Sequence, residues 1–186
     1  MRGWLEWLSR RPDEDTARMG KFSMDAQSGG LMGLLKRFIV SDIDEFAAND
    51  VRLKIIGDWR ALAPDVVALI EDAIARTAHN RRTTLAVALN YGAQDELVRA
   101  AKAAAAEGEI SAETIAAHLD TADMPPLDLL IRTSGEMRIS NYLLWQVAYA
   151  EFYSTSVYWP DFGKEELRQA LIEYGKRQRR FGRVEL

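Results

Sequence analysis

The chain contains no cysteine and only two histidines, His79 and His118. The absence of cysteine excludes disulfides, thiolate nucleophiles and cysteine–zinc sites, and it is typical of a reducing compartment. One histidine follows an expected helix and the other lies within one, which leaves little material for a Ser-His-Asp triad. We therefore interpret both histidines as structural or solvated and look elsewhere for the chemistry.

Long apolar runs and a strong charge of one sign are also missing. No stretch approaches the roughly 20 apolar residues of a membrane span. The opening MRGWLEWLSRR lacks the apolar core and small-residue cleavage site of a signal peptide. A net charge of −4 does not suggest a general nucleic-acid binder. We expect a soluble cytoplasmic protein, in which a local basic pocket for a small anion is still compatible with the overall charge.

The chain does have length and apolar content, since its 186 residues are 48% hydrophobic. That is enough for one domain with a full core, which we assign to residues 31–186. Residues 1–30 are rich in tryptophan and charge and then polar, so we expect an atypical, poorly ordered segment. A terminal helix docked on the body is one alternative, and a partner-binding or membrane-surface helix is another.

From residue 31 onward, helical and strand patterns alternate. Strands are expected over 51–57, 83–90, 127–134 and 152–159, and helices over 31–46, 64–79, 94–108, 111–119, 140–152 and 164–180. This order predicts an α/β fold with a mostly parallel central sheet flanked by helices. Ligands of such sheets bind beyond the carboxyl ends of the strands.

One such strand end carries an unusual group of polar residues, in LLIRTSGEMRIS at 129–140. Arg132 ends an apolar strand, Arg138 follows a glycine turn, and Ser140 stands where the next helix should begin. Guanidinium groups, a hydroxyl and a helix N-terminus all suit phosphate oxygens, so these residues predict a diphosphate site. The alternative is a surface loop in which Arg132 pairs with Glu136 and Ser140 only caps the helix.

Glu151 lies eleven residues beyond Ser140, about three helical turns on, and would share its face. It is a candidate ligand for Mg²⁺, which accepts one or two carboxylates plus phosphate oxygens. The alternative is a solvated acid. The basic run KRQRRFGR at 176–183 raises nucleic-acid binding as a third function, although such a run at a helix end is usually solvated.

The run DLLIRTSGEMRISNYLLWQVAYAEFYSTSVYWPDF resembles the C-terminal signature of the cis-prenyltransferases, the undecaprenyl diphosphate synthase or isoprenyl transferase family. LMGLLKRFI, VRLKIIGD and ALNYGAQDEL resemble its middle segments. The resemblance implies an undecaprenyl-diphosphate-synthase-like fold and a Mg²⁺-dependent enzyme. Such an enzyme extends an allylic diphosphate, with farnesyl diphosphate as the expected primer, by isopentenyl diphosphate into a long Z-polyprenyl diphosphate, a cell-wall lipid carrier. It also implies a homodimer that touches the membrane periphery when product leaves.

The resemblance implies roles for individual residues as well. Isopentenyl diphosphate would be bound by Arg132, Arg138, Ile139 and Ser140, and Glu151 would bind Mg²⁺. The product would grow in an apolar tunnel. Candidate wall residues, which would look the same in an ordinary core helix, are Leu31, Leu34, Leu35, Phe38 and Ile39.

The family's Asp-Gly-Asn-Gly-Arg-Trp loop, which holds the allylic diphosphate and anchors Mg²⁺, is not found in this sequence. No catalytic residue is therefore identified. Met137 stands where some members carry a histidine, and Gln94 where the NYGGR-like stretch has arginine. Loss of one oriented donor can cost roughly 3–4 kcal/mol of transition-state stabilisation, so impaired catalysis is expected. A truncated or non-catalytic member that serves as a partner subunit is the alternative.

Overall fold

The computed structural model describes residue 33 and residues 42–177. The chain divides into two compact units, one including Pro12–Tyr91 and the other Gly92–Leu186, called unit 1 and unit 2 below. The atypical segment 1–30 and the five tunnel-wall candidates lie outside the described residues. The assignment of residues 31–186 to a single domain stays a prediction.

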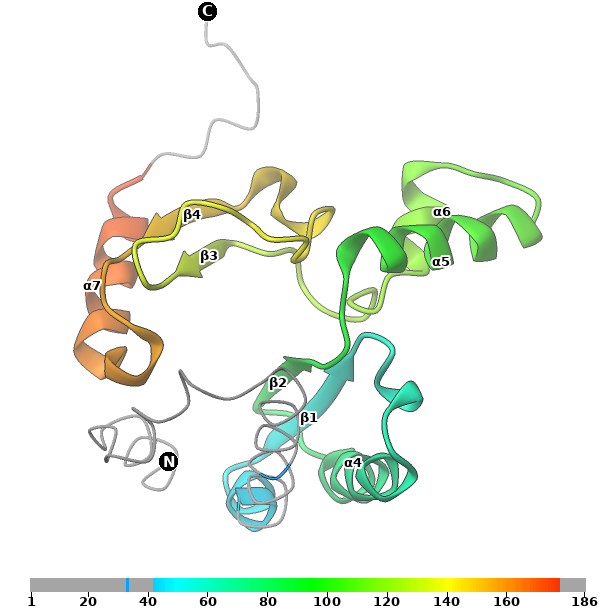
Figure 1. The fold of residues 1–186 in the computed structure, drawn as a ribbon, viewed down its shortest axis with the longest axis horizontal. Coiled ribbons are helices and arrows are strands. Elements are labelled where there is room, and N and C mark those ends of the chain that lie inside the picture. The colour runs from blue at the N-terminus through cyan, green and yellow to red at the C-terminus, as the bar shows by residue number, and fades with distance from the viewer. Residues whose placement is uncertain (1–32, 34–41, 178–186) are drawn as a thin grey trace, which may run out of the picture. The chain divides into compact units, whose positions relative to one another are not determined.

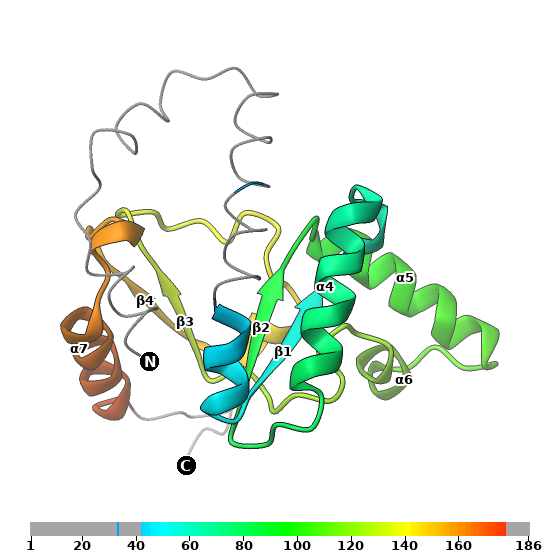
Figure 2. The same cartoon turned by 90° about the horizontal axis from the view of Figure 1, so that it is seen from below.

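Unit 1 is built on two parallel strands, β1 (Val51–Ile56) and β2 (Thr83–Ala88), paired in register from Val51 with Thr83 to Ile56 with Ala88. The helix between them, α4 (Pro64–Thr77), begins with proline, whose fixed φ suits a first turn. A short 3-10 helix, η2 (Trp59–Ala61), follows β1. Figure 2 shows α4 running alongside the two strands, as a parallel crossover requires.

The core of unit 1 forms because α4 repeats apolar side chains on one face. Val66, Ile70 and Ala73 are buried at helical spacing and pack with apolar residues of β1 and with Ile43 and Phe46. These last two belong to residues 42–48, which are helical as predicted for the end of the 31–46 helix. The hydroxyl of Thr77, also buried, accepts the N–H of Leu53 at 3.1 Å and covers the outer edge of β1.

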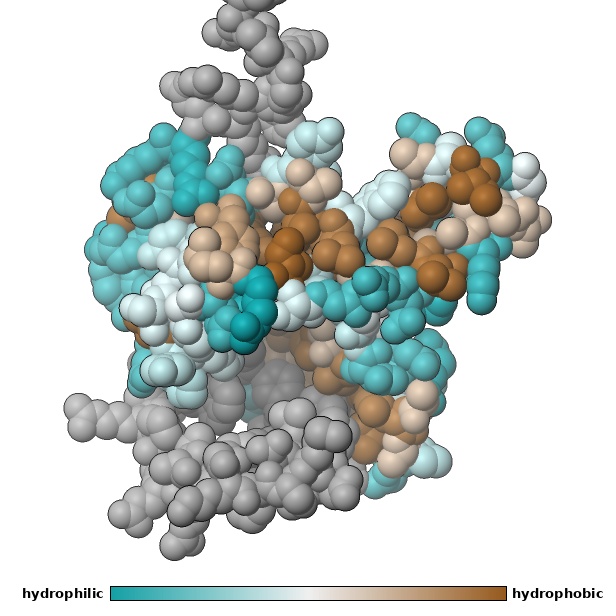
Figure 3. Space-filling model, turned by 45° about the horizontal axis from the view of Figure 1, so that its top comes forward, coloured by the Kyte–Doolittle hydropathy of each residue, from teal (hydrophilic) through white to brown (hydrophobic). Residues whose placement is uncertain are grey.

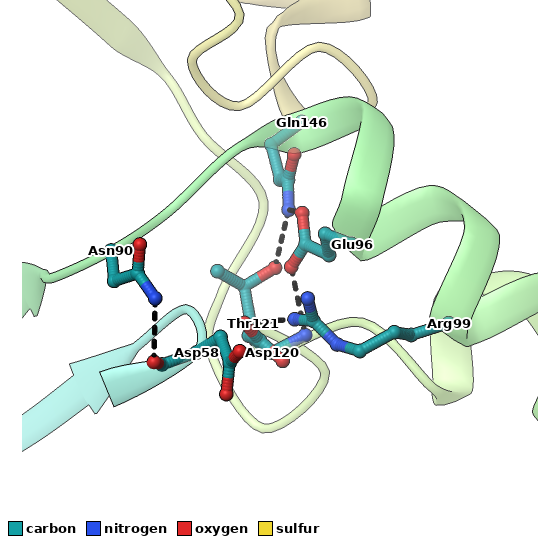
Figure 4. A network of polar contacts seen from close by, with 7 residues as sticks. All are labelled: Asp58, Asn90, Glu96, Arg99, Asp120, Thr121 and Gln146. Carbon is teal, nitrogen blue, oxygen red and sulfur yellow. Dashed lines mark hydrogen bonds and ion pairs between the residues drawn. The ribbon is translucent and has the colours of Figure 1, made fainter. Parts of the chain in front are cut away.

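The carboxyl ends of β1 and β2 are fastened to each other by backbone and side-chain hydrogen bonds. The N–H of Asp58 donates to the carbonyl of Asn90 at 3.1 Å, and the Asn90 amide donates back to the Asp58 carbonyl at 2.9 Å (Figure 4). Gly57 has φ +97, and a Cβ there would meet the carbonyl oxygen of Leu89. Glycine is therefore needed at this turn.

Unit 2 contains three α-helices, two strands and two 3-10 helices among its described residues (Figure 1). In chain order they are α5 (Ala93–Ala106), α6 (Ala112–Ala117), β3 (Leu129–Arg132), η3 (Gln146–Tyr149), β4 (Glu151–Ser154), η4 (Trp159–Asp161) and α7 (Lys164–Gly175). A capping box between Ser111 and Thr114 begins α6. Strands β3 and β4 are parallel, with Leu129 beside Glu151 and Arg132 beside Ser154.

The predicted α/β fold with parallel strands is confirmed. Among the described residues, pairing joins β1 with β2 and β3 with β4, so that two two-stranded sheets are present. The predicted helix over 140–152 is wrong. Ser140, Asn141 and Leu143 have φ of 55, 59 and 50, which interrupts a right-handed helix. The chain forms η3 and then enters β4 one residue before the expected strand.

No helix in the described ranges has both the length and the apolar composition needed to cross a bilayer.

Candidate functional site

Arg132 is the last residue of β3, at the carboxyl end of the strand, as predicted. Its Nε is buried and has no hydrogen-bond partner among the described residues. The predicted alternative, in which Arg132 pairs with Glu136, is not what the structure shows, because Glu136 pairs with Arg138. A buried guanidinium N–H without an acceptor is costly. Arg132 is therefore suited to an anionic ligand.

The turn after Arg132 is held against the end of β4. The N–H groups of Ser134 and Gly135 donate to the carbonyls of Val157 and Thr155 at 2.9 and 2.8 Å. The Ser154 hydroxyl donates to the carbonyl of Glu136 at 3.1 Å. Ser134 and Gly135 have positive φ, of 66 and 69. The Thr-Ser-Gly turn is thus a fixed structure that determines where the following residues start.

Arg138 lies directly after this turn and is largely exposed, with 71% of its side chain accessible. One of its terminal nitrogens donates to Oε1 of Glu136 at 2.8 Å. An exposed ion pair contributes about 0–1 kcal/mol. A diphosphate, with its larger charge, can therefore replace Glu136 as the partner of Arg138 at little cost.

Ser140 is exposed and has a left-handed backbone with φ 55. It does not begin a helix, since the next helical element is η3, which starts at Gln146 and has four residues. The predicted contribution of a helix N-terminus at Ser140 is therefore wrong, because the left-handed residues at 140, 141 and 143 separate Ser140 from any helical turn. Its hydroxyl remains a candidate donor to phosphate.

A cavity of about 290 Å³ lies beside these residues in unit 2. It is lined only by apolar side chains, those of Leu130, Met137, Ile139, Val147, Ala150 and Phe152. Leu130 and Phe152 are neighbours in the sheet register and both face the cavity. Alternate residues of a strand share a face, so Arg132, two residues beyond Leu130, lies on the cavity side of β3. Arg138 directly precedes Ile139 in the lining.

Glu151 does not lie where the sequence predicted. It is the first residue of β4 and not part of a helix. Because Phe152 faces the cavity, its neighbour Glu151 faces the other side of the sheet. There its Oε2 accepts a hydrogen bond from Nη1 of Arg177 at 2.9 Å. Glu151 is thus an ion-pair partner, turned away from the Arg132 side.

The predicted Mg²⁺ site, made of Glu151 and phosphate oxygens, stays a prediction. No group of three or more histidine, aspartate or glutamate side chains is close enough to hold a metal ion in residues 42–177. The one predicted ligand, Glu151, is paired with Arg177. The basic run at 176–183 is also engaged where it is described, since Lys176 pairs with Glu173 at 2.6 Å. Arg177 pairs with Glu151, and residues 178–183 lie outside the described range.

Two residues that matter for this site were not singled out by the sequence. Asn141 accepts N–H groups of the first turn of α5, from Ala93 at its carbonyl and from Gln94 at its side chain. Glu96, 1% exposed, accepts a hydrogen bond from Gln146 at 3.2 Å. An acid inside an alanine-rich helix was the available signal, but its partners lie 24 and 50 residues away.

Large apolar and aromatic side chains of the 137–149 stretch are exposed, namely Met137, Tyr142, Leu144, Trp145 and Tyr149. Figure 3 shows hydrophobic residues beside hydrophilic ones on one face of the protein. Tyr142 is only 37% exposed, and this partial burial raises the pKa of its phenol above its ordinary 10.0. Met137 is 73% exposed even though it lines the cavity, so the cavity opens to solvent beside it.

Comparison with known proteins identifies the family to which this site belongs. Residues 24–182 match the model of the Prenyltransf family, undecaprenyl diphosphate synthase. The chain belongs to this family. An isoprenyl transferase of Agrobacterium fabrum is 47% identical over 166 residues, covering 85% of this chain and 67% of the relative. One of Zymomonas mobilis is 50% identical over 160 residues, covering 82% and 64%.

Solved structures of prenyl diphosphate synthases have the same fold. Lavandulyl diphosphate synthase from Lavandula x intermedia, in complex with dimethylallyl diphosphate, has a TM-score of 0.81 and 33% identity over 88% of this chain and 74% of that one. A "probable undecaprenyl diphosphate synthase" of Campylobacter jejuni has a TM-score of 0.78 and 32% identity, over 90% and 79%. The matched segment spans about two thirds of the curated relatives' length.

Proposed function

We propose that this cis-prenyltransferase chain takes part in cis-prenyl chain elongation. Isopentenyl diphosphate would be condensed with an allylic diphosphate, in repeated steps, to a long Z-polyprenyl diphosphate. In each step the allylic C–O bond breaks and diphosphate leaves, the new carbon–carbon bond forms, and the isopentenyl unit loses a proton from C2. The names of the relatives support this reaction class. The observation that carries it in this chain is the unpartnered Nε of Arg132 on the cavity side of β3.

The cavity and the two arginines together suit an amphiphilic ligand. Isopentenyl diphosphate has a five-carbon apolar group and a diphosphate with a charge near −3. The apolar lining, Leu130 and Ile139 included, would take the hydrocarbon. Arg132 and Arg138, with the hydroxyl of Ser140, would take the phosphate oxygens by charge-assisted hydrogen bonds. In this assignment Arg138 exchanges Glu136 for the ligand.

The remaining parts of the proposal come from the family. Farnesyl diphosphate is the proposed primer, the active form is a homodimer, and the protein works in the cytoplasm and releases product at the membrane surface. Mg²⁺ is proposed as the counter-ion of the diphosphates. Glu151, whose partner in the structure is Arg177, is the residue that would hold it.

Isothermal calorimetry of the full chain with isopentenyl diphosphate tests the binding part. We expect saturable heat in the wild type and at least about tenfold weaker binding for Arg132→Ala, since a charge-assisted hydrogen bond contributes about 1.5–3 kcal/mol. Arg168→Ala on α7 removes an exposed, ion-paired arginine elsewhere and is the control. Wild-type protein that binds no isopentenyl diphosphate would rule the proposal out.

Turnover is a separate measurement. The chain alone, given Mg²⁺, farnesyl diphosphate and labelled isopentenyl diphosphate, is expected to incorporate label into a long lipid if it is catalytic. Binding without incorporation would restrict the function to a partner subunit that holds isopentenyl diphosphate.

A further inference from the structure

The first turn of α5 lacks a cap of its own. A helix leaves its first four N–H groups without intrahelical partners, and the N-cap residue of α5, Gly92, has no side chain to accept them. Asn141 supplies the acceptors from 47 residues further along the chain. Its carbonyl accepts the N–H of Ala93 at 2.9 Å, and its side-chain Oδ1 accepts the N–H of Gln94 at 3.0 Å.

Gly92 leaves the space that this contact needs. A Cβ at position 92 would lie 2.9 Å from Nδ2 of Asn141 and 3.1 Å from Oδ2 of Asp95. The first distance is shorter than side chains tolerate. The absence of a side chain at position 92 therefore lets Asn141 approach the helix end closely enough to cap it.

The same helical turn makes a second connection through Glu96. Oε1 of Glu96 accepts the N–H of Asp120 at 2.9 Å, and Oε2 accepts the Gln146 amide at 3.2 Å (Figure 4). Gln146 also donates to the Thr121 hydroxyl at 2.9 Å, while Arg99 pairs with Asp120 at 2.9 Å. Glu96 is 1% exposed, so its own two hydrogen bonds are shielded from competing water.

The two connections lie at Asn141 and Gln146, in a segment that does not form a regular helix. Positive φ at Ser140, Asn141 and Leu143 prevents a regular helical hydrogen-bond ladder. Arg138 and Ile139 lie within three residues before the first connection, at Asn141, and Val147 directly follows the second, at Gln146. Ile139 and Val147 line the apolar cavity. The position of this wall therefore depends on contacts with α5.

We propose that the first turn of α5 is the positioning element of the diphosphate site, acting through Asn141 and Gln146 on the 138–150 segment. Asn141 and Glu96 are positioning residues and touch no ligand. This inference rests on the proposed function, since the ligand used to measure it is isopentenyl diphosphate. Its consequence is that side chains of α5 and its partners control affinity for that ligand.

A reciprocal exchange tests the Glu96–Gln146 contact. Gln146→Glu places two carboxylates together and should weaken isopentenyl diphosphate binding about tenfold by calorimetry on the full chain. In the exchange variant, Glu96→Gln with Gln146→Glu, the new Gln amide donates to the new Glu, and the Thr121 hydroxyl donates to it as well. Binding should return to within about twofold of wild type. Failure of the exchange to restore binding would overturn the assignment of Gln146.

Asn141→Ala tests the other connection. Because Asn141 is exposed, this variant should fold even if the Gln146 variant does not. We expect about tenfold weaker binding with a urea midpoint close to wild type. Gln169→Ala removes an exposed amide on α7 that donates to Glu165, and it should bind as wild type does. Asn141→Ala with wild-type affinity would overturn the inference and leave the proposed function standing. A wild type that does not bind would instead reject the proposed function itself.

Discussion

Arg177 connects the end of α7 to the start of β4 through Glu151. Its Nη1 donates to Oε2 of Glu151 at 2.9 Å and to the backbone carbonyl of Phe152 at 2.9 Å. The pair spans 26 residues of sequence. It gives Glu151 a partner within its own chain, on the face of β4 opposite the cavity.

A double-mutant cycle with Glu151→Gln and Arg177→Gln should measure this pair. Their side chains are 26% and 36% exposed, so solvent screens the interaction and a coupling free energy of about 0.5–1 kcal/mol is expected from urea unfolding. A coupling free energy of zero would contradict the role of Arg177 as a tertiary contact.

Thr77 should stabilise unit 1 through its hydroxyl. The hydroxyl is fully buried, donates to the carbonyl of Ala73 at 2.9 Å and accepts the N–H of Leu53 at 3.1 Å. Thr77→Val keeps the shape and leaves the Leu53 N–H unsatisfied, which should lower the free energy of unfolding by about 1–3 kcal/mol. Thr77→Ser keeps the hydroxyl and is the control. Equal stability of the two variants would show that the hydrogen bond is not needed.

Alanine substitutions at Gly57 and Gly108 should distinguish the cost of a left-handed backbone from the cost of steric crowding. Both have a left-handed backbone, with φ +97 and +99. A Cβ at Gly57 meets the Leu89 carbonyl and Tyr91, whereas one at Gly108 meets nothing within 4 Å. Alanine should cost about 1 kcal/mol at Gly108 and at least about 2–3 kcal/mol at Gly57, measured by urea unfolding. A similar loss at both positions would mean that the turn after β1 can relax.

The pKa of Glu165 should report the hydrogen bonds that this carboxylate accepts in the first turn of α7. Hydrogen bonds from Arg168, and secondly from Gln169, lower its pKa from 4.5 to about 2. A lowered folded-state pKa contributes stability above the unfolded value, and this contribution is lost as pH falls from about 4.5 through about 2. Carboxyl NMR titration should show the low pKa, and Arg168→Ala should raise it. Glu173, whose pKa is lowered by Lys176, should be unchanged by that substitution. A Glu165 pKa that Arg168→Ala does not move would contradict this cause.

Prediction from sequence succeeded where local pattern and burial agree. The alternation of 51–56 and the apolar run at 83–88 form β1 and β2, and Pro64 begins α4, because each follows from side-chain periodicity within its own segment. Arg132 at the end of a buried strand was located for the same reason.

Prediction failed where a distant partner decides the conformation. Residues 140–152 have helical spacing, yet Asn141 caps α5 and Glu151 pairs with Leu129 in the sheet. Local propensity differs by less than about 1 kcal/mol per residue, so such tertiary hydrogen bonds can outweigh it. The same applies to the ion pair of Glu136. Arg132 and Arg138 are both near it in sequence, and in the folded turn its partner is Arg138.

The sequence by itself determined the family, the order of most strands and helices, and the arginines expected to meet a diphosphate, since these depend on residue type and short-range spacing. Only the tertiary structure decided that Glu151 faces Arg177, that the cavity is lined from β3, β4 and η3, and that α5 holds the segment beside it. These features arise from hydrogen bonds and packing between residues 20 to 50 positions apart, as in the contacts of Glu96 with Asp120 and Gln146. Pairings over such separations are not encoded in local periodicity.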